Sequence, residues 1–354
     1  MDNRSFFNQP LSEWMKGNGP ESDIVISSRI RLARNLRELP FPVLATNQHA
    51  KQTLDRVAPL LSNDELNEIS SFELVMLDEL NELDKKVLVE KHLVSPALVN
   101  DSKSGAAIVS ENESISIMVN EEDHLRIQIL HPGFQLKEAW DLSNQIDDVF
   151  ESQLDYAFDE RCGYLTSCPT NVGTGMRASV MMHLPALVFT QQINRILSAI
   201  SQVGLVVRGM YGEGSEATGN LFQISNQITL GQSEDDIIDN LHRVAKQIIE
   251  HERAARERLL VDSRVRLMDR VCRSYGILSH AAIIDSKEAA QRLSDIRLGS
   301  DLGLLDNPSS HVFNELIIMT QPGYLQQYAG EPLTPDERDL RRAELIRSRL
   351  AKTE

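Results

Sequence analysis

The chain has 354 residues, of which 41% are hydrophobic and 25% charged, an ordinary balance for a globular protein that is long enough for two domains. Its 52 acidic and 36 basic residues give a formal net charge of −16, which argues against general binding to nucleic acids or anionic membranes. The sequence contains no long apolar run typical of a membrane span and no apolar segment near Met1 typical of a signal peptide.

The cysteines are Cys162, Cys168 and Cys272, and they form neither a Cys-x-x-Cys pair nor a zinc-binding pattern. We therefore expect a protein of the reducing cytoplasm without a structural disulfide framework. No dedicated metal site is predicted from the sequence.

The first predicted strand covers residues 24–26 and runs into the segment 27–34, after a polar lead-in at 1–22. If the strand continues, its alternation places Arg29 and Arg31 on one face. Two neighbouring arginines indicate either a solvated, charged edge or a clamp for an anion. The second interpretation needs further arginines that converge on the same place.

Helices are predicted over residues 48–82, and short strands at 106–110, 115–120 and 125–130. His92 lies between two apolar stretches, where a structural histidine is more common than a ligand. The turn at 120–124 has three consecutive carboxylates and is followed by Arg126. This pattern is typical of a surface turn, but it also suits a site for a phosphate and a cation.

The stretch from Cys168 to Arg177 combines a thiol, two glycines and an arginine within ten residues. Glycines allow backbone N–H groups to approach an anion, and an arginine can bind phosphate oxygens through two nitrogens. The spacing matches neither a P-loop nor a dinucleotide-binding fingerprint. The surrounding elements are predicted as a helix at 136–150, strands at 164–166, 204–211 and 221–230, and a helix at 188–203. Between the last two strands, the glycine-rich, acidic loop 212–219 is a candidate lid.

A long helix is predicted to begin after the cap residue Ser233 and to end near residue 260, where the composition changes. Beyond it we predict only helices, at 264–278, 287–298 and 312–320, and a final helix with Thr334 as its cap. We place a domain boundary near 258–262. A helical domain of this size would need support from a neighbouring domain or a dimer partner.

Four motifs in this order resemble the guanidino (phosphagen) kinases: Ser-Ser-Arg-Ile-Arg at 27–31, Asn-Glu-Glu-Asp-His-Leu-Arg at 120–126, the stretch 168–177, and Arg-Gly-x-x-Gly-Glu at 208–213. The resemblance extends from about residue 20 to 255. The chain lacks the N-terminal helical domain of the metabolic members and has an additional helical part at its end. In both respects it is similar to the bacterial protein-arginine kinases, whose Arg-Asp-x-x-Arg-Ala motif for phosphoarginine resembles residues 338–343.

The resemblance implies an α+β fold, in which a phosphagen-kinase-like catalytic domain with an antiparallel sheet flanked by helices precedes an all-helical domain. The expected division is a lead-in at 1–22, a catalytic domain at 23–258 and a helical domain at 259–354 for dimerisation and phosphoarginine binding. The implied reaction transfers the γ-phosphoryl of ATP, with Mg²⁺, to arginine side chains of proteins. Two alternatives remain open, a kinase for free arginine and an inactive adaptor that reads phosphoarginine.

The resemblance also implies partners and a place in the cell. The partners are protein substrates bearing arginine, a second copy of the chain, an activator protein, a Clp ATPase and protease that degrades the marked proteins, and a heat-shock repressor. The implied location is the bacterial cytoplasm, with no membrane and no direct nucleic-acid binding.

Three residues are implied in catalysis, Glu122 as the base, Glu213 as a second carboxylate for the guanidinium, and Cys168 as a nearby thiolate. Glu121 is the adjacent alternative for the base. The implied phosphoarginine site consists of Arg338, Asp339, Leu340, Arg341, Arg342 and Ala343. ATP would contact Ser27, Ser28, Arg29, Ile30, Arg31, His92, Arg126, Arg177, Ala178, Ser179, Val180, Met181, Arg208, Gly209, Met210, Tyr211 and Gly212, of which the five arginines clamp the phosphates.

Overall fold

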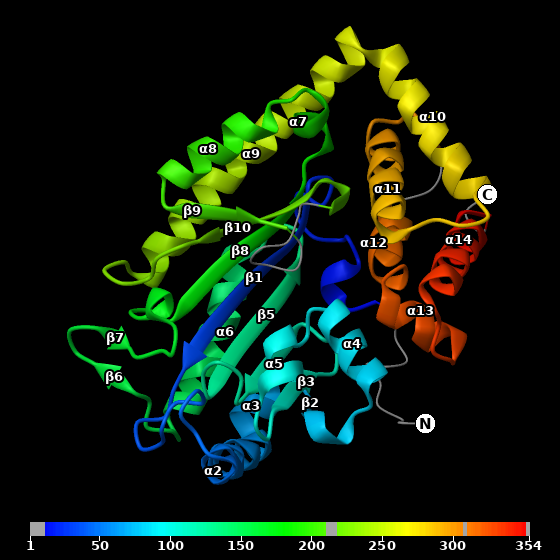
Figure 1. The fold of residues 1–354 in the computed structure, drawn as a ribbon. Coiled ribbons are helices and arrows are strands. Elements are labelled where there is room, and N and C mark those ends of the chain that lie inside the picture. Colours follow the sequence, from blue (N-terminus) through cyan, green and yellow to red (C-terminus); the bar gives the residue numbers. More distant parts are fainter. Residues whose placement is uncertain (1–10, 210–217, 307–309, 352–354) are drawn as a thin grey trace.

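An eight-stranded sheet with the order β2-β3-β4-β5-β1-β8-β10-β9 organises the protein (Figure 1), in a computed structural model that describes residues 11–209, 218–306 and 310–351. All neighbouring strands in it pair antiparallel, as expected from the sequence. Its strands are β1 Val25–Arg34, β2 Phe72–Met76, β3 Ala106–Ser110, β4 Ile115–Val119, β5 Leu125–Pro132, β8 Met176–His183, β9 Leu205–Arg208 and β10 Leu221–Asn226. A separate ribbon pairs β6 Phe158–Asp159 with β7 Gly163–Tyr164.

One face of this sheet is covered by helices, and the main hydrophobic core lies between them. Ile30 and Leu32 of β1 point into this core, where α6 contributes Leu136, Ile146 and Phe150. The predicted amphipathic helix at 136–150 is confirmed. The helices described are α2 Asn47–Val57, α3 Asp64–Ile69, α4 Glu82–Glu90, α5 Pro96–Asp101, α6 Leu136–Glu151, α7 Pro185–Phe189, α8 Ile193–Gln202, α9 Glu234–Asp262, α10 Arg264–His280, α11 Ser286–Asp301, α12 Ser310–Met319, α13 Pro322–Ala329 and α14 Pro335–Ala351.

The helices predicted over 48–82 are confirmed as far as residue 69, and the prediction is wrong from 72 to 76. Residues 72–76 form β2, which pairs with β3 at the edge of the sheet. Tertiary pairing outweighs local helix preference here, because β2 packs Val75 against Val109 and Met118 in a second, smaller core. The confirmed strands β3, β4 and β5 lie close to their expected bounds.

Three elements between residues 163 and 230 are divided or shorter than expected. The helix predicted at 188–203 is divided into α7 and α8, and Gln191 at the break has a positive φ of 59°. The strand predicted at 221–230 ends at Asn226, because its side chain leaves the ladder to bond the backbone of Ala178 and Met176. The strand predicted at 164–166 is the two-residue β7.

The predicted helices after residue 262 are confirmed, and they pack around their own apolar cluster, which includes Leu293, Phe313 and Ile346. The final helix begins as expected. The Thr334 hydroxyl accepts a hydrogen bond from the Glu337 backbone N–H, and the Glu337 carboxylate accepts from the backbone N–H and the hydroxyl of Thr334. One helix ends at 262 and the next begins at 264. The domain boundary near 258–262 stays a prediction. Within the described ranges, no helix has the length and apolar character of a membrane span.

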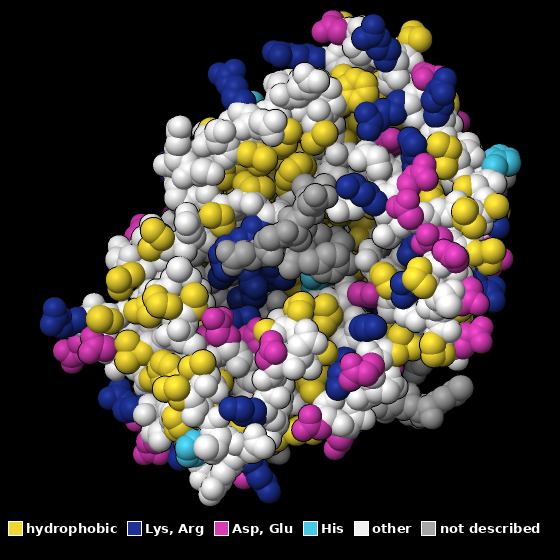
Figure 2. All heavy atoms as spheres, in the orientation of Figure 1, with side chains coloured by type: hydrophobic (Ala, Val, Ile, Leu, Met, Phe, Trp, Pro, Cys, Tyr) yellow, Lys and Arg dark blue, Asp and Glu magenta, His cyan; other side chains and the backbone are white. Residues whose placement is uncertain are grey.

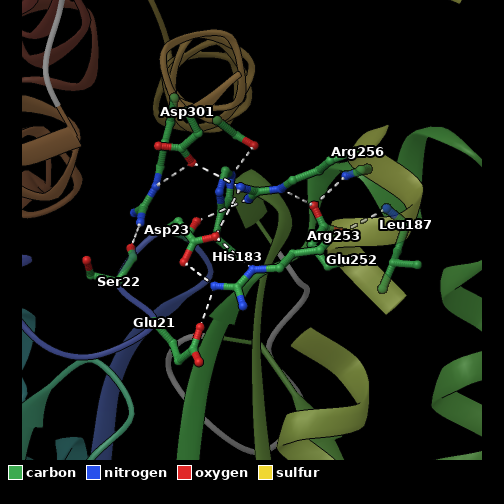
Figure 3. Close-up of polar contacts among 12 residues, drawn as sticks. Glu21, Ser22, Asp23, His183, Leu187, Glu252, Arg253, Arg256 and Asp301 are labelled. Carbon is green, nitrogen blue, oxygen red and sulfur yellow. Dashed lines mark hydrogen bonds and ion pairs between the residues drawn. The ribbon is translucent and has the colours of Figure 1, made fainter. Parts of the chain in front are cut away.

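A buried polar network joins α9 and α11 to the segment just before β1 (Figure 3). Arg256 is its centre, with Nε 2.9 Å from Glu252 Oε1, Nη2 donating to the Asp23 carbonyl at 3.1 Å, and Nη1 3.4 Å from Asp301. Arg253 pairs with Asp23 at 2.9 Å. Since residues 21–23 lead directly into β1, this network holds the helical region against the strand that carries Arg29 and Arg31.

The carboxylate of Glu90 forms a second polar contact of the helical region, which connects α4 to α13. It accepts hydrogen bonds from the backbone N–H groups of Gly323, at 2.6 Å, and Tyr324, at 2.9 Å. A Cβ atom at residue 323 would lie 2.8 Å from a Glu90 oxygen, so a larger residue there would require the Glu90 side chain to shift. Burial raises the pKa of Glu90 to about 7, against the two hydrogen bonds, which lower it.

We expect the variant Glu90→Gln to alter how stability depends on pH. The carboxyl titrates near 4.5 when unfolded and near 7 when folded, so its contribution to stability is complete below about pH 4.5 and is lost as pH rises to about 7. Relative to Glu90→Gln, the native protein should lose on the order of 2 kcal/mol of unfolding free energy between pH 5 and pH 8. Urea unfolding of both proteins measures this difference. If the difference in unfolding free energy between the two proteins stayed constant from pH 5 to pH 8, the raised pKa of Glu90 would be contradicted.

Candidate active site

Five arginines from four strands lie on the face of the sheet opposite the main core. Arg31 is directly opposite Arg177 in the β1–β8 ladder, and the pairing registers place Arg29, Arg126 and Arg208 on the same side. The register shifts once in β1, between Val25 and Ser27, where a bulge precedes these residues. Figure 2 shows basic side chains gathered in a hollow in the middle of this face.

These arginines repel one another in a buried setting. Burial, followed by Arg177 and Arg126, lowers the pKa of Arg29 to about 10. Burial, Arg29 and Arg126 lower the pKa of Arg31 further. Arg31 Nε is buried and has no hydrogen-bond partner in the part of the chain that the structure describes. Such a cluster suits a polyanionic ligand. Its negative charge would raise the pKa values of the arginines again, and its oxygens would accept the hydrogen bond that Arg31 Nε lacks.

Two adjoining cavities lie over the arginines, with volumes of about 370 and 180 Å³. Arg31, Arg126, Arg177 and Arg208 line both, Glu122 and Cys168 line the larger, and Arg29 and His92 line the smaller. The structure therefore brings together the predicted residues from all four motifs, as far as those motifs are described. Glu213, Met210, Tyr211 and Gly212 lie outside the described residues, and Gly209 is buried beside Arg208.

His92 forms part of the wall of the smaller cavity. Its φ is 60°, its backbone carbonyl accepts a hydrogen bond from Gln128 at 2.7 Å, and its ring packs edge-on against Trp14. Burial, with Arg29 and Arg31, lowers the pKa of His92 to about 3, so the ring is neutral at pH 7. A neutral ring next to the clamp suits a contact with a nucleotide base better than one with phosphate.

The other residues predicted to contact ATP lie on both faces of β1 and β8. Ser179 receives a hydrogen bond from Arg29 Nε at 3.4 Å, and Met181 lies on the same face. Ser28 donates to the Gly133 carbonyl at 2.9 Å and is fully buried. The side chains of Ile30, Ala178 and Val180 lie in the main core, so only their backbone could meet a ligand. Ser27 is buried and lines a small cavity between Trp14 and Arg29.

The two neighbouring glutamates of the β4–β5 turn differ in their surroundings. Glu121 is 2% exposed and bonds both Ser95 and Arg126 Nη1, the latter at 2.7 Å. Glu122 is 45% exposed and lies 2.9 Å from Arg126 Nη2. Burial raises the pKa of Glu122, although Arg126 opposes the shift. Of the two, Glu122 is therefore the carboxylate that a substrate in the larger cavity can reach.

Asp123, the third carboxylate of this turn, connects the turn to the loop from Cys168 to Gly175, which we call the cysteine loop. It is fully buried, and one of its oxygens accepts from Asn35 Nδ2 at 2.6 Å and from the backbone N–H of Ser167 at 2.7 Å. Cys168 follows directly, with its Sγ 3.0 Å from Thr170 Oγ1. Asp123 thus holds Glu122 and Cys168 on the same cavity wall, a role that the sequence did not indicate.

A buried ion pair under the cysteine loop was also not predicted. Arg34 Nη2 lies 2.6 Å from Asp147 Oδ2, and Nη1 donates to the carbonyls of Ala33 and Thr174 at 2.9 Å. A Cβ atom at residue 175 would lie 2.6 Å from Arg34 Nη1, and Gly175 has a φ of 65°. This glycine is thus required by the close approach of Arg34. The signal in the sequence was the phase of Arg34, which alternation assigns to the opposite face from Arg29 and Arg31.

The residues of the predicted phosphoarginine motif lie on α14, apart from the arginine cluster. Arg342 is 2% exposed, and its guanidinium donates to the carbonyls of Thr320 and Ile284 at 2.9 Å and to Asp339. Arg338 is half-buried. Ala343 is buried, Leu340 is exposed, and Arg341 pairs at the surface with Glu344.

Among the described residues, no group of three or more histidines, cysteines or carboxylates could hold a metal ion. The cluster instead carries positive charge. A divalent cation at this site would therefore have to arrive with an anionic ligand.

Comparisons with known proteins agree with this geometry. Residues 55–255 match the model of the ATP:guanido phosphotransferase C-terminal catalytic domain, and residues 264–354 match the protein-arginine kinase McsB C-terminal domain. A protein-arginine kinase from Brevibacillus brevis is 61% identical over 99% of this chain and 98% of its own, and one from Bacillus subtilis is 59% identical over 99% and 96%. A crystal structure of lombricine kinase aligns with a TM-score of 0.59 and 26% identity over 68% of each chain.

Proposed function

Because the chain belongs to the protein-arginine kinases, which share the ATP:guanido phosphotransferase catalytic domain, we propose that the arginine cluster and Glu122 form its active site. The enzyme transfers a phosphoryl group to guanidino groups of arginine. The observation that carries the assignment of the site is the convergence of five arginines, Glu122 and Cys168 on connected cavities.

The arginines would bind the triphosphate of ATP. Four strands of one sheet present the guanidinium groups of Arg29, Arg31, Arg126, Arg177 and Arg208, and the ladder registers set their positions. A preorganised clamp stabilises charge on the transferring phosphoryl group without reorganisation during the reaction. The fold agrees with ATP at this site, and Mg²⁺ bound to it would neutralise phosphate charge.

The acceptor guanidinium is cationic, so it must lose a proton as the N–P bond forms. Glu122 is accessible from the cavity, and its raised pKa makes it a stronger base than an ordinary glutamate. In the proposed reaction the carboxylate of Glu122 takes this proton, while the γ-phosphoryl leaves ADP and joins the guanidino nitrogen. Cys168, as a thiolate, would add negative charge beside the guanidinium, and Glu213 would bind it as a second carboxylate.

The experiment that tests this function uses purified protein, Mg-ATP and casein, with phosphosites located by mass spectrometry before and after mild acid. We expect acid-labile phosphate on arginine side chains. Labelling confined to free arginine would favour a small-molecule kinase, and the absence of transfer would favour the inactive adaptor. The retention of Glu122 and the arginine cluster in one hollow argues against the adaptor.

We also propose the finer organisation that the family suggests. The catalytic domain would extend over 23–258 and the helical domain over 259–354, which would form the homodimer. Val261 and Val265 near the start of α10 are more than 80% exposed and support an interface there. An activator protein, a Clp ATPase with its protease, and a heat-shock repressor would be the partners in the bacterial cytoplasm.

Phosphoarginine would bind at the motif on α14, with Arg338 as the available cation. We expect Arg338→Ala to weaken binding of free phosphoarginine at least tenfold, since a charge-assisted pair is worth roughly 1.5–3 kcal/mol. Calorimetric titration measures this, with Arg341→Ala as the matched surface control. Arg342→Ala should also lose binding, but it should lower the melting temperature because Arg342 is buried. Unchanged affinity in Arg338→Ala and Arg342→Ala would exclude this site.

A further inference from the structure

A third cavity, of about 500 Å³, lies on the other side of Glu122 from the arginine cluster. Glu122 lines both this cavity and the larger one over the arginines. The remaining wall comes from the turn before α2, with Pro42 and Val43, from α5, with Ala97 and Asp101, and from Glu121. None of these groups lines the cavities over the arginines, although Glu121 bonds Arg126. We call this cavity the outer groove.

The walls of the outer groove are tied together by polar contacts between its separate segments. Lys103 Nζ donates to the Ala45 carbonyl at 2.7 Å, which joins the end of α5 to the turn before α2. Asn120 Nδ2 donates to the carbonyls of Ala50, at 2.8 Å, and Ser104, at 3.1 Å. The groove is therefore a built feature of the fold that meets the catalytic turn directly.

Two properties of the outer groove indicate its occupant. Val43 and its neighbour Leu44 are 74% and 78% exposed, so they offer apolar surface that the protein itself does not cover. Asp101, Glu121 and Glu122 add carboxylates to the walls, against the single ammonium group of Lys103. Apolar surface with excess negative charge favours a ligand that is apolar and cationic and disfavours an acidic one.

We propose that the outer groove binds the polypeptide on either side of the acceptor arginine. This inference rests on the proposed function, because it takes Glu122 as the point where the acceptor guanidinium lies. A substrate polypeptide whose arginine reaches Glu122 from the outer groove would continue past Val43 and Asp101. The groove thus recognises an extended segment with apolar or basic residues next to the arginine and discriminates against acidic neighbours.

The test compares a peptide acceptor with a minimal one. The peptide Ac-Leu-Lys-Arg-Leu-Ala-amide and the single residue N-acetylarginine amide are phosphorylated by the native enzyme, Val43→Asn and a control. Asparagine removes the apolar contact without changing the charge of the groove. Val203→Asn is the control, because Val203 is a 47% exposed valine outside the groove. We expect Val43→Asn to raise KM for the peptide about tenfold, the scale of a lost apolar contact, while KM for ATP and kinetics with N-acetylarginine amide stay unchanged.

A charge reversal tests the electrostatic part independently. In the native enzyme, replacing the peptide's lysine with glutamate should raise KM, and Asp101→Lys should reduce this penalty. Unchanged peptide KM in Val43→Asn, together with the same glutamate penalty in Asp101→Lys, would overturn the outer groove while leaving the proposed function intact. A native enzyme that phosphorylates neither acceptor would overturn the proposed function itself.

Discussion

The variant Glu122→Gln is expected to lower kcat for arginine phosphorylation by roughly 10²–10⁴-fold, the usual contribution of a general base. Glutamine keeps the shape of the side chain and can still bond Arg126, but it cannot take a proton from the guanidinium. ATP affinity should change little, because the arginines are the residues proposed to bind the nucleotide. Steady-state kinetics, with nucleotide binding followed by calorimetry, measures both quantities.

Glu121→Gln provides the informative comparison, since its carboxylate is buried and bonded to Arg126 and Ser95. We expect it to weaken ATP binding, because Arg126 loses the carboxylate that orients it, with a smaller effect on kcat. The opposite pattern, with kcat lost in Glu121→Gln and retained in Glu122→Gln, would reassign the base to Glu121.

Removal of the buried carboxylate under the cysteine loop should cause the largest loss of stability. Asp147→Ala leaves the guanidinium of Arg34 buried without its ion-pair partner, and breaking such a pair costs roughly 3–5 kcal/mol. Chemical denaturation should show this loss of unfolding free energy. The neighbouring Asp148 is exposed on the same helix, so Asp148→Ala serves as the matched control and should change stability by about 0.5 kcal/mol or less.

Activity offers a second measurement for Asp147→Ala. Because Arg34 also bonds the Thr174 carbonyl, the loop from Cys168 to Gly175 should lose order and kcat should fall even where the protein remains folded. Asp147→Asn keeps part of the hydrogen bonding and should lie between the native protein and the alanine variant. Equal stability of Asp147→Ala and Asp148→Ala would contradict this account.

The arginine cluster could be anticipated from the sequence because strand alternation is a local rule. It places Arg29 and Arg31 together without any knowledge of their neighbours, and the motif order supplied Arg126, Arg177 and Arg208. The choice between Glu121 and Glu122 could not be made in the same way. It depends on which carboxylate is covered by Ser95, a residue of another segment.

Contacts between distant segments account for the other differences. β2 forms because β3 is available to pair with it, although its own sequence follows a helical region. Asp123 and Asp147 are ordinary acidic residues in the sequence, and only their buried partners Asn35, Ser167 and Arg34 reveal their roles. Local patterns and the order of the motifs thus indicated the residues that meet at the cavities but missed the residues that support them.

The bulge between Val25 and Ser27 has a consequence for how this sequence can change in evolution. It sets the phase of β1, so that Arg29 and Arg31 face the cavities and Ile30 and Leu32 face the core. One residue inserted between Ser28 and Arg29 would exchange these faces, burying two cations and exposing two aliphatic side chains. Related sequences should therefore tolerate substitutions in β1 more readily than single-residue insertions or deletions, and changes in length should collect in the turns outside it.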